Sequence, residues 1–416
     1  MITKKPYIAL SYPEFRFFLS MRFFLTLAYQ VQAVIIGWYV YSITKNPLSL
    51  GLIGLAEALP AIGIALYSGY IADKADRALL LRWVLAVMFV ASALLYFITL
   101  PQIATQLGTQ KLVLLIYVII FIIGLARGFY APAAFSLMSM IIKREHYANS
   151  STWNSSIWQT ASIIGPALGG LMYGFAGLNH SFILVLVFML LSLSCIFFIK
   201  RRPPVFVPTT NIFESLSEGL KFVFKNKIIV GALSLDLFSV FFGGAVALIP
   251  VVAREILNVG AQEFGFMRAA PAIGAVVTMF AMTRFSPMNK PWRNLLIAIT
   301  GFGICIIGFG LSKSYYLSIA FLVLEGGFDS VSVIIRSTLL QMLTPDEMRG
   351  RVSAVNSMFI GSSNEIGQFE SGLTARLMGT VPAIVFGGCV TLSVVGITWF
   401  KTKAFVHKSL DELARR

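Results

Sequence analysis

Long apolar runs separated by short polar turns cover nearly the whole chain of 416 residues. A helix that crosses the hydrocarbon core of a bilayer needs about 20 mostly apolar residues, and the runs in this chain approach or exceed that length. The pattern predicts helices at 16–42, 48–71, 79–100, 112–141, 150–175, 181–199, 227–252, 263–285, 292–312, 315–342, 351–377 and 382–400. These segments leave no room for a sizeable soluble domain. We therefore expect an all-α integral membrane protein with twelve transmembrane helices.

One polar connection is much longer than the others and divides the chain. It covers 200–226 and opens with three bases and two prolines. Further along it, apolar residues alternate with Glu214 and Glu218, which favours an amphipathic helix on the cytoplasmic face; a disordered linker is the alternative. We expect a six-helix bundle at 1–199, a cytoplasmic linker with this helix at 200–226, and a second six-helix bundle with a short cytoplasmic tail at 227–416.

Two pairs of segments relate the halves of the chain. Residues 54–63 align without gaps with 265–274, and residues 145–155 align with 347–357. The first pair falls in the second helix of each predicted half, and the second pair falls at the start of the fifth helix. Two matches at equivalent places favour an internal duplication over chance. We therefore expect two pseudo-symmetric six-helix bundles that handle a substrate near the membrane midplane.

The composition agrees with a membrane protein. Hydrophobic residues make up 57% of the chain, charged residues 12%, and the mean hydropathy is +0.82, whereas a soluble domain carries about 25% charged residues. The net charge of +15 could indicate nucleic-acid binding, but the bases gather in alternate loops, as the positive-inside rule describes. We therefore expect both termini in the cytoplasm, a retained first helix without signal cleavage, and no nucleic-acid partner.

Cysteine and histidine offer little for metal or redox chemistry. The three cysteines lie far apart within apolar runs, and the three histidines, including His146 beside Glu145, lie in predicted loops or the tail. We expect no disulfide, no metal site and a solvated His146. A phosphate-binding loop needs a Gly-Lys pair, and the sequence contains none. No catalytic constellation stands out either, so the pattern favours a gradient-driven transporter without a cofactor over an ATP motor or a membrane-embedded enzyme.

Ionisable side chains inside the predicted helices are the main functional candidates, because a charge in hydrocarbon is costly and usually faces a cavity or a partner. The candidates for proton coupling or gating are Glu57, Arg127, Asp236, Arg268, Glu325, Asp329, Glu365 and Glu370. The repeat places Glu57 at the position of Arg268, and Arg127 at the position of Asp329, with opposite charges in each pair. Glu325 lies four residues before Asp329 on one helix face, which disfavours ionisation of both carboxylates.

Two interpretations of these charges stay open. In the first, a carboxylate pairs with an arginine in one conformation and is protonated in the other, which makes a proton-linked gate. In the second, static ion pairs hold the helices together. Arg336 and Arg376 lie near predicted helix ends, so we expect them to reach the interface or to hold structure. Six uncharged residues are candidates for a polar path, with helix–helix contact as the alternative. They are Gln30, Gln32, Asn154, Gln159, Asn364 and Gln368.

The turn between the second and third predicted helices carries a charged motif. Gly69, Asp73, Lys74 and Arg77 combine a glycine, a carboxylate and two bases. This resembles the loop signature of the major facilitator superfamily, G-x-x-x-D-R/K-x-G-R/K, except that Asp76 stands where the pattern has glycine. The resemblance implies a twelve-helix secondary transporter with the major facilitator fold. The turn can act as a charge latch that caps a helix or pairs with bases in one conformation; a solvated turn is the alternative.

The fifth predicted helix contains Gly165-Pro166 followed by Gly169-Gly170. Glycines four residues apart allow two backbones to approach closely, and the proline bends the helix. The segment resembles the G-P-x-x-G-G motif of drug/proton antiporters in the same superfamily. Tight packing without a role in export would explain it equally well.

Residues 344–372 and 38–51 are similar to the enterobactin-exporter-like branch of this superfamily, which includes macrolide-efflux proteins. The resemblance covers essentially the whole chain. It implies a bacterial inner-membrane exporter that moves a small-molecule substrate, a siderophore or a hydrophobic drug, by alternating access on a proton gradient. Surrounding membrane lipid is a further partner, and an outer-membrane efflux partner stays open. A lipid or lysophospholipid flippase, a metal exporter and a transporter-like sensor are the alternatives.

Overall fold

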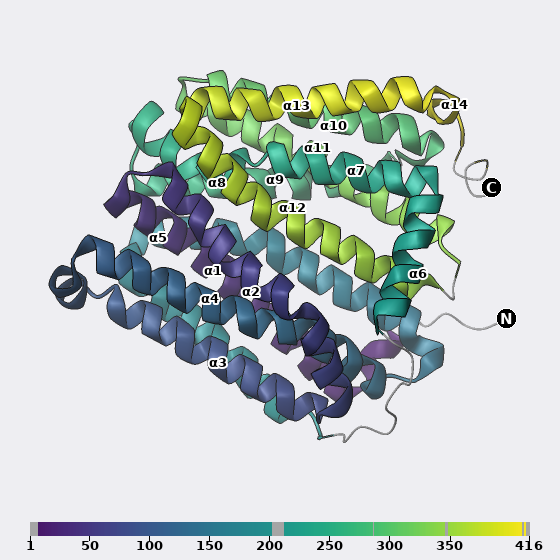
Figure 1. Ribbon diagram of the computed structural model, residues 1–416, viewed down its shortest axis with the longest axis horizontal. Helices are drawn as coiled ribbons and strands as arrows, with labels where there is room; N and C mark the ends of the chain where they lie inside the picture. The colour runs from purple at the N-terminus through teal and green to yellow at the C-terminus, as the bar shows by residue number, and fades with distance from the viewer. Residues whose placement is uncertain (1–6, 202–211, 286, 346–347, 410–411, 413–416) are drawn as a thin grey trace. The chain divides into compact units, whose positions relative to one another are not determined.

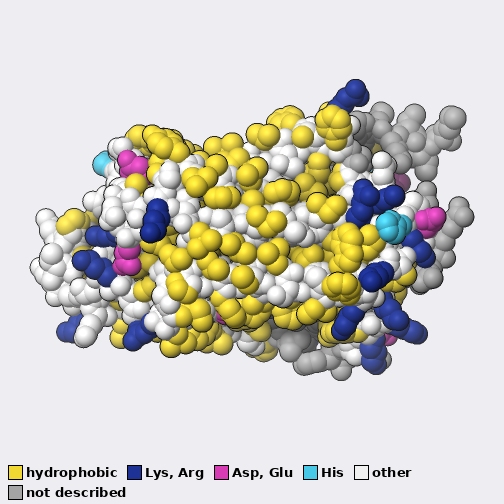
Figure 2. All heavy atoms as spheres, turned by 90° about the horizontal axis from the view of Figure 1, so that it is seen from above, with side chains coloured by type: hydrophobic (Ala, Val, Ile, Leu, Met, Phe, Trp, Pro, Cys, Tyr) yellow, Lys and Arg dark blue, Asp and Glu magenta, His cyan; other side chains and the backbone are white. Residues whose placement is uncertain are grey.

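The computed structural model describes residues 7–201, 212–285, 287–345, 348–409 and 412, and every regular element in this part is helical (Figure 1). Helices dominate because a backbone within the bilayer must satisfy its N–H and C=O groups internally. Ten of the described helical segments are long and apolar enough to cross a membrane. On the face drawn in Figure 2, hydrophobic side chains cover the middle, and Lys and Arg side chains lie toward the ends.

The chain divides into two compact units. The first comprises residues 1–44 and 56–212, and the second comprises residues 45–55 and 213–416. The boundary therefore falls within α2 (Pro47–Lys74). The bundle and linker boundaries expected from the sequence stay a prediction, and much of the expected linker lies outside the described residues.

The first unit contains long helices that follow one another with short turns. Besides most of α2, its elements are the 3-10 helices η1 (Ile8–Ser11) and η2 (Arg144–His146) and the α-helices α1 (Pro13–Thr44), α3 (Arg77–Ile98), α4 (Pro101–Ile141) and α5 (Tyr147–Phe197). α3 and α4 lie side by side (Figure 1). α4 departs from helical geometry at Gly108, where φ is +71°, so a short first segment precedes its membrane span.

α5 contains two spans that run in opposite directions. Its backbone leaves helical geometry at Gly177, where φ is +75° and ψ is −177°, a conformation that glycine adopts readily. The pairs in contact between α5 and the N-terminal segment, in order along α5, are Asn149 with Ala9, Gly169 with Val31, Phe188 with Phe24 and Phe198 with Phe17. The partner number rises before Gly177 and falls after it. α5 therefore supplies both helices that the sequence predicts at 150–175 and 181–199.

The second unit begins with an amphipathic helix and continues with further long helices. Its elements are α6 (Ile212–Lys225), α7 (Lys227–Phe242), α8 (Ala245–Val251), the π-helical turn η3 (Val252–Ile256), α9 (Ala261–Arg284), the 3-10 helix η4 (Pro287–Asn289), α10 (Pro291–Leu311), α11 (Tyr315–Leu343), α12 (Arg349–Met378), α13 (Thr380–Lys401) and α14 (Lys403–Val406). α6 runs across the direction of α7 (Figure 1), and its Val223 is buried against Ile229 and Leu233.

α12 has 30 residues but does not belong to the ten apolar segments, because polar side chains such as Asn364, Gln368 and Glu370 interrupt its hydrophobic surface. The segment from α7 to η3 forms a single span with an irregular middle at Gly243 and Gly244. When α5 is counted as two spans and α12 is added, the described part contains the twelve membrane helices that the sequence predicts.

Both units contain the same close crossing between the second and fourth membrane helices of their half. A Cβ atom on Gly124 of α4 would clash with the backbone of Glu57 on α2, and a Cβ atom on Gly326 of α11 would clash with the backbone of Pro271 on α9. The repeat alignment pairs Pro60 with Pro271 and Gly124 with Gly326. The duplication found in the sequence is therefore also a duplication of helix packing.

Candidate functional site

Three polar side chains from three helices meet inside the first unit. Glu57 of α2 forms an ion pair with Arg127 of α4. Tyr29 of α1 donates its hydroxyl proton to Oε1 of Glu57 over 2.6 Å, and Nη1 of Arg127 donates to the same hydroxyl over 2.8 Å. The guanidinium carbon of Arg127 also lies 4.3 Å from the centre of the Tyr29 ring. These contacts form a closed network of one acid, one base and one phenol.

The packing of α4 on α2 explains why this network forms. Gly124 brings the backbone of α4 against the backbone of α2 at Glu57. Arg127 follows Gly124 by three residues and therefore lies on nearly the same helix face. The side chain of Glu57 is 10% exposed and that of Arg127 is 31% exposed. Removal of Arg127 would leave the buried carboxylate of Glu57 without its ion-pair partner, which is much more costly than loss of a surface ion pair.

Sequence reasoning selects Glu57 and Arg127 but misses Tyr29. Gln30 and Gln32, which lie close to Tyr29 in the sequence, are polar-path candidates. Tyr29 is not selected with them because an aromatic residue is ordinary in a membrane helix. The available signal is a hydroxyl within a short polar cluster of an otherwise apolar helix. A buried tyrosine hydroxyl usually has a hydrogen-bond partner, so this cluster could have been extended to include it.

The second unit contains a separate group of charges. Asp236 of α7 forms an ion pair with Arg336 of α11, and their side chains are 6% and 7% exposed. Asp329 lies two turns before Arg336 on α11, and the charges of both Asp236 and Arg336 act on it. Of the two roles expected for Arg336, this ion pair agrees with holding structure and not with reaching the membrane interface. The guanidinium of Arg336 is buried against a carboxylate because α7 packs on α11 at this depth.

The other charged pair of the second unit is looser. Arg268 of α9 donates Nη1 to the carbonyl of Val246 over 3.1 Å. Glu325 is buried on α11, and the charges of Arg268 and Glu325 act on each other. In the described part of the chain, neither Nε of Arg268 nor Oε2 of Glu325 has a hydrogen-bond partner. Arg268 and Glu325 therefore leave more polar atoms without hydrogen bonds than the network of Glu57 does.

The remaining acidic candidates lie on α12. Glu370 accepts a hydrogen bond from the hydroxyl of Thr374 over 2.7 Å and is partly buried. The side chain of Glu365 lies outside the described part. Both residues therefore remain candidates without a described arginine partner.

The six polar-path candidates do not form one continuous chain. Gln32 is buried, Gln30, Asn154 and Gln159 are partly buried, and Asn364 and Gln368 are exposed. No hydrogen bond between any two of them occurs among the described residues. Asn364 donates to the carbonyl of Ile360 on its own helix over 2.9 Å, and Oδ1 of Asn154 and Oε1 of Gln32 are buried without a partner in the described part.

The loop signature combines a cap and an anchor. Asp76 is the N-cap of α3, and its Oδ1 accepts from the N–H groups of Ala78 and Leu79 over 3.0 and 3.1 Å. Arg77 is buried and donates Nε to the hydroxyl of Ser136 on α4 over 3.0 Å. Gly69 and Asp73 lie in the last turns of α2, which ends at the exposed Lys74, and the side chain of Asp73 lies outside the described part. The departure from the signature at Asp76 therefore serves to start α3.

The glycines of the fifth membrane helix face α1. A Cβ atom on Gly165 would meet the side chain of Gln30, and one on Gly169 would lie 3.0 Å from the backbone of Val31. Pro166 lies inside α5, and Gly170 is buried. Close helix packing accounts for the spacing of these glycines, whatever further role the motif has.

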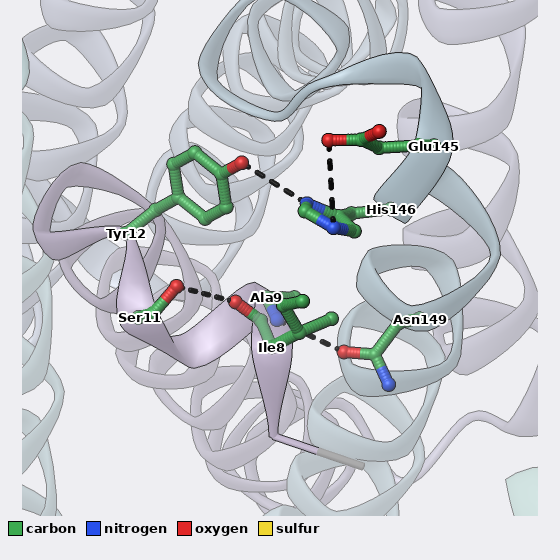
Figure 3. A network of polar contacts seen from close by, with 7 residues as sticks. All are labelled: Ile8, Ala9, Ser11, Tyr12, Glu145, His146 and Asn149. Atoms are coloured by element: carbon green, nitrogen blue, oxygen red, sulfur yellow. Dashed lines mark hydrogen bonds and ion pairs between the residues drawn. The ribbon is translucent and has the colours of Figure 1, made fainter. Parts of the chain in front are cut away.

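A polar clamp joins the start of the chain to the start of α5 (Figure 3). The hydroxyl of Tyr12 lies 3.0 Å from Nδ1 of His146, and Oε1 of Glu145 lies 3.7 Å from Nε2 of the same ring. The N–H of Ala9 donates to Oδ1 of Asn149 over 3.1 Å. The expectation of a solvated His146 is wrong, because its side chain is only 18% exposed and contacts Tyr12.

Solved structures with the same fold are integral membrane transporters. A D-xylose–proton symporter matches 96% of this chain and 99% of its own, with a TM-score of 0.70 and 14% identity. A bacterial homologue of the iron transporter ferroportin matches 97% and 99%, with a TM-score of 0.68 and 15% identity. These likenesses show the fold alone, and they confirm the major facilitator fold predicted from the sequence.

The chain belongs to the transmembrane secretion effector family of the major facilitator superfamily. The model of this family matches residues 5–416. The enterobactin exporter EntS of Shigella flexneri is 22% identical over 395 residues, which cover 93% of this chain and 91% of the exporter. The uncharacterized MFS-type transporter YfmI of Bacillus subtilis is 23% identical over 317 residues, 73% of this chain and 77% of its own length. The family and the branch predicted from the sequence are therefore confirmed.

Proposed function

We propose that this protein is a secondary active exporter of a siderophore or a similar hydrophobic organic compound. The observation that carries the proposal is its end-to-end similarity to enterobactin exporters, which covers more than nine tenths of both chains. We propose a bacterial inner membrane as its site, with both termini in the cytoplasm as the positive-inside distribution predicts. An outer-membrane efflux protein would then be the next carrier for the exported compound.

Energy for export would come from protons that move inward as the cargo moves outward. The network of Glu57, Tyr29 and Arg127 supports this proposal, because it holds a carboxylate among membrane helices next to its only described base. Protonation of Glu57 would cancel its charge and weaken its attraction to Arg127. The freed guanidinium would then favour a different arrangement of α1, α2 and α4. Such a charge-dependent rearrangement is what alternating access requires of a proton-linked gate.

Two alternatives concern the cargo. A lipid or lysophospholipid flippase would use the same fold with a lateral opening. A metal exporter would need ligands along its path, and the described residues contain no group of three or more His, Cys, Asp or Glu side chains that could hold a metal ion. We therefore favour an organic cargo for the first experiment.

The cargo can be identified by comparing exported metabolites of a deletion strain with those of its parent under iron limitation. A siderophore retained inside the mutant, and released again when the gene is restored, is the expected result. An unchanged siderophore profile together with altered membrane lipid asymmetry would contradict the proposal and favour the flippase.

Proton coupling can be tested with purified protein in sealed vesicles that hold a pH gradient. We expect Glu57→Gln to reduce gradient-driven cargo transport at least tenfold, because the carboxylate can no longer exchange a proton. Glu145→Gln is the matched control, because Glu145 lies in η2 just before α5 and is 67% exposed, and we expect it to transport normally. Full activity of Glu57→Gln, and also of Asp329→Asn and Glu365→Gln, would rule out a proton-linked gate at these carboxylates.

A further inference from the structure

A small cavity with a partly polar lining lies between three helices of the second unit. Its volume is about 10 Å³, and its polar lining comes from Asp236 and Ser239 of α7 and from Asp329 and Ser332 of α11. Phe302 of α10 is among the residues that line it on the apolar side. A cavity needs roughly 10–15 Å³ to hold one water molecule. The space therefore suits a single water-sized occupant.

The charges around this cavity do not cancel. Arg336 neutralises Asp236, to which it is paired. Asp329 forms no ion pair within the described part of the chain, although both of these charges act on it. Glu325 and Arg268 carry further charges that act on each other. When all five of these groups are ionised they sum to one negative charge, and an uncompensated charge in a low-dielectric interior is strongly unfavourable.

One oxygen at the cavity lacks a partner. Ser239 is 5% exposed, and its hydroxyl oxygen makes no hydrogen bond to any residue that the structure describes. Buried hydroxyl groups nearly always have a partner in a protein or an ordered ligand. The polar side chains that line the cavity offer oxygen atoms, which are the ligands that hard cations prefer.

The backbone beside the cavity is irregular. α7 ends at Phe242, and the N–H of Gly243 donates to the carbonyl of Ser239 over 2.8 Å. α8 then starts again at Ala245. Non-helical backbone within a membrane occurs where it is buried in protein or lines a cavity, and interrupted helices in transporters commonly adjoin their ion sites. The interruption follows Ser239 by about one turn.

We infer that this cavity binds one monovalent metal cation, with Na⁺ as the natural occupant. A single positive charge would neutralise the site, whereas a divalent cation would leave it with an excess positive charge. Asp329 would supply the compensating carboxylate, and the hydroxyl groups of Ser239 and Ser332 would supply neutral oxygen ligands. The binding itself does not depend on export, so this inference and the proposed function can fail separately.

Binding of ²²Na⁺ to the purified full-length protein in nanodiscs, without cargo, tests the inference. Choline chloride keeps the ionic strength constant while unlabelled NaCl competes. We expect saturable binding of about one Na⁺ per chain. Asp329→Asn should abolish it, because the site then becomes neutral without a cation. Ser239→Ala should weaken the affinity about tenfold, as expected for loss of one good ligand contact.

Ser330→Ala is the matched control, because Ser330 is also a buried serine of α11 but does not line the cavity. We expect it to bind Na⁺ normally. Thermal unfolding in choline chloride verifies that each variant is folded, and the Na⁺-dependent rise in Tm should follow the binding results. Absence of saturable ²²Na⁺ binding to the unmodified protein would overturn the inference. The same conclusion would follow if Ser239→Ala and Asp329→Asn bound ²²Na⁺ as well as the unmodified protein does.

Discussion

The two halves of this transporter place opposite charges at equivalent positions and then use them differently. In the first unit, Glu57 and Arg127 pair directly and share a hydroxyl. In the second unit, Arg268 and Asp329 occupy the corresponding positions, but the arginine donates to a backbone carbonyl and the aspartate lies beside another ion pair. The crossing of α2 and α4 therefore carries a directly paired acid and base. Asp329, three residues after the equivalent crossing at Gly326, instead lines a cavity between α7, α10 and α11.

The close helix crossings at Gly124 and Gly326 are present in both halves. They are retained because a larger residue at either position would collide with backbone atoms of the neighbouring helix. Charged side chains are long and can select among several partners. The second unit also contains the charges of Asp236, Glu325 and Arg336. These charges compete with the pairing of Arg268 and Asp329, the residues aligned with Glu57 and Arg127.

The largest effect should come from breaking the more buried of the two ion pairs. Arg336→Leu leaves Asp236 and Asp329 without a cationic side chain, and we expect a loss of about 3–5 kcal/mol in the free energy of unfolding. Arg127→Leu should cost less, because the side chain of Arg127 is 31% exposed whereas that of Arg336 is 7% exposed. Denaturant or thermal unfolding in a defined detergent measures both changes.

A second substitution checks the origin of that loss. Asp236→Asn added to Arg336→Leu removes one of the uncompensated carboxylates and should restore part of the stability. Equal stability of the single and double variants would mean that packing of the long arginine side chain, and not its charge, causes the effect.

An intermediate effect should distinguish the two halves at another aligned pair. Gly274 of α9 packs directly on the backbone of Val323, whereas its equivalent Gly63 of α2 has no neighbour within 4 Å of an added Cβ atom among the described residues. We expect Gly274→Ala to destabilise the protein by about 1–3 kcal/mol through overpacking. Gly63→Ala should change stability by less than about 0.5 kcal/mol. Similar melting temperatures for both variants would contradict the described difference in packing.

The smallest effect should come from the phenol in the first unit. Tyr29→Phe removes the hydrogen bond to Glu57 and the one from Arg127 but keeps the ion pair and the aromatic ring, so we expect a loss of about 1–2 kcal/mol. Cargo transport should also depend differently on pH, because the carboxylate loses a donor. Tyr96→Phe on α3 is the control, since the Tyr96 ring packs on Phe182 in a similar apolar setting. Unchanged stability and an unchanged pH profile of Tyr29→Phe would contradict a role of the Tyr29 hydroxyl in the network.

Much of the fold was predictable because the membrane simplifies the problem. Apolar length identifies spans, and the distribution of bases predicts their orientation. α12 was recognisable despite its polar residues because the repeat requires a helix at that place, and the turn within α5 was recognisable from its two apolar runs. Candidate charges could be selected for the same reason, since hydrocarbon makes each of them exceptional.

The partners of those charges could not be predicted with the same success. Sequence position left two roles open for Arg336, at the interface or in holding structure, and it suggested a solvated His146. Arg336 is buried against Asp236, and His146 contacts Tyr12. Tyr29 was not selected at all. Each of these contacts joins residues far apart in the sequence, so local pattern carries no direct information about them.

The sequence by itself determined the class of protein, the succession of membrane helices and the short set of residues in which its chemistry must lie. These properties follow from burial of apolar segments in a bilayer, which depends on composition and length. Only the tertiary structure decided that Glu57 contacts Arg127 and Tyr29 while Asp329 lines a small cavity with Ser239 and Ser332. Ion pairing and cavity formation depend on atoms brought within a few ångströms by helix packing, and that distance is set in three dimensions.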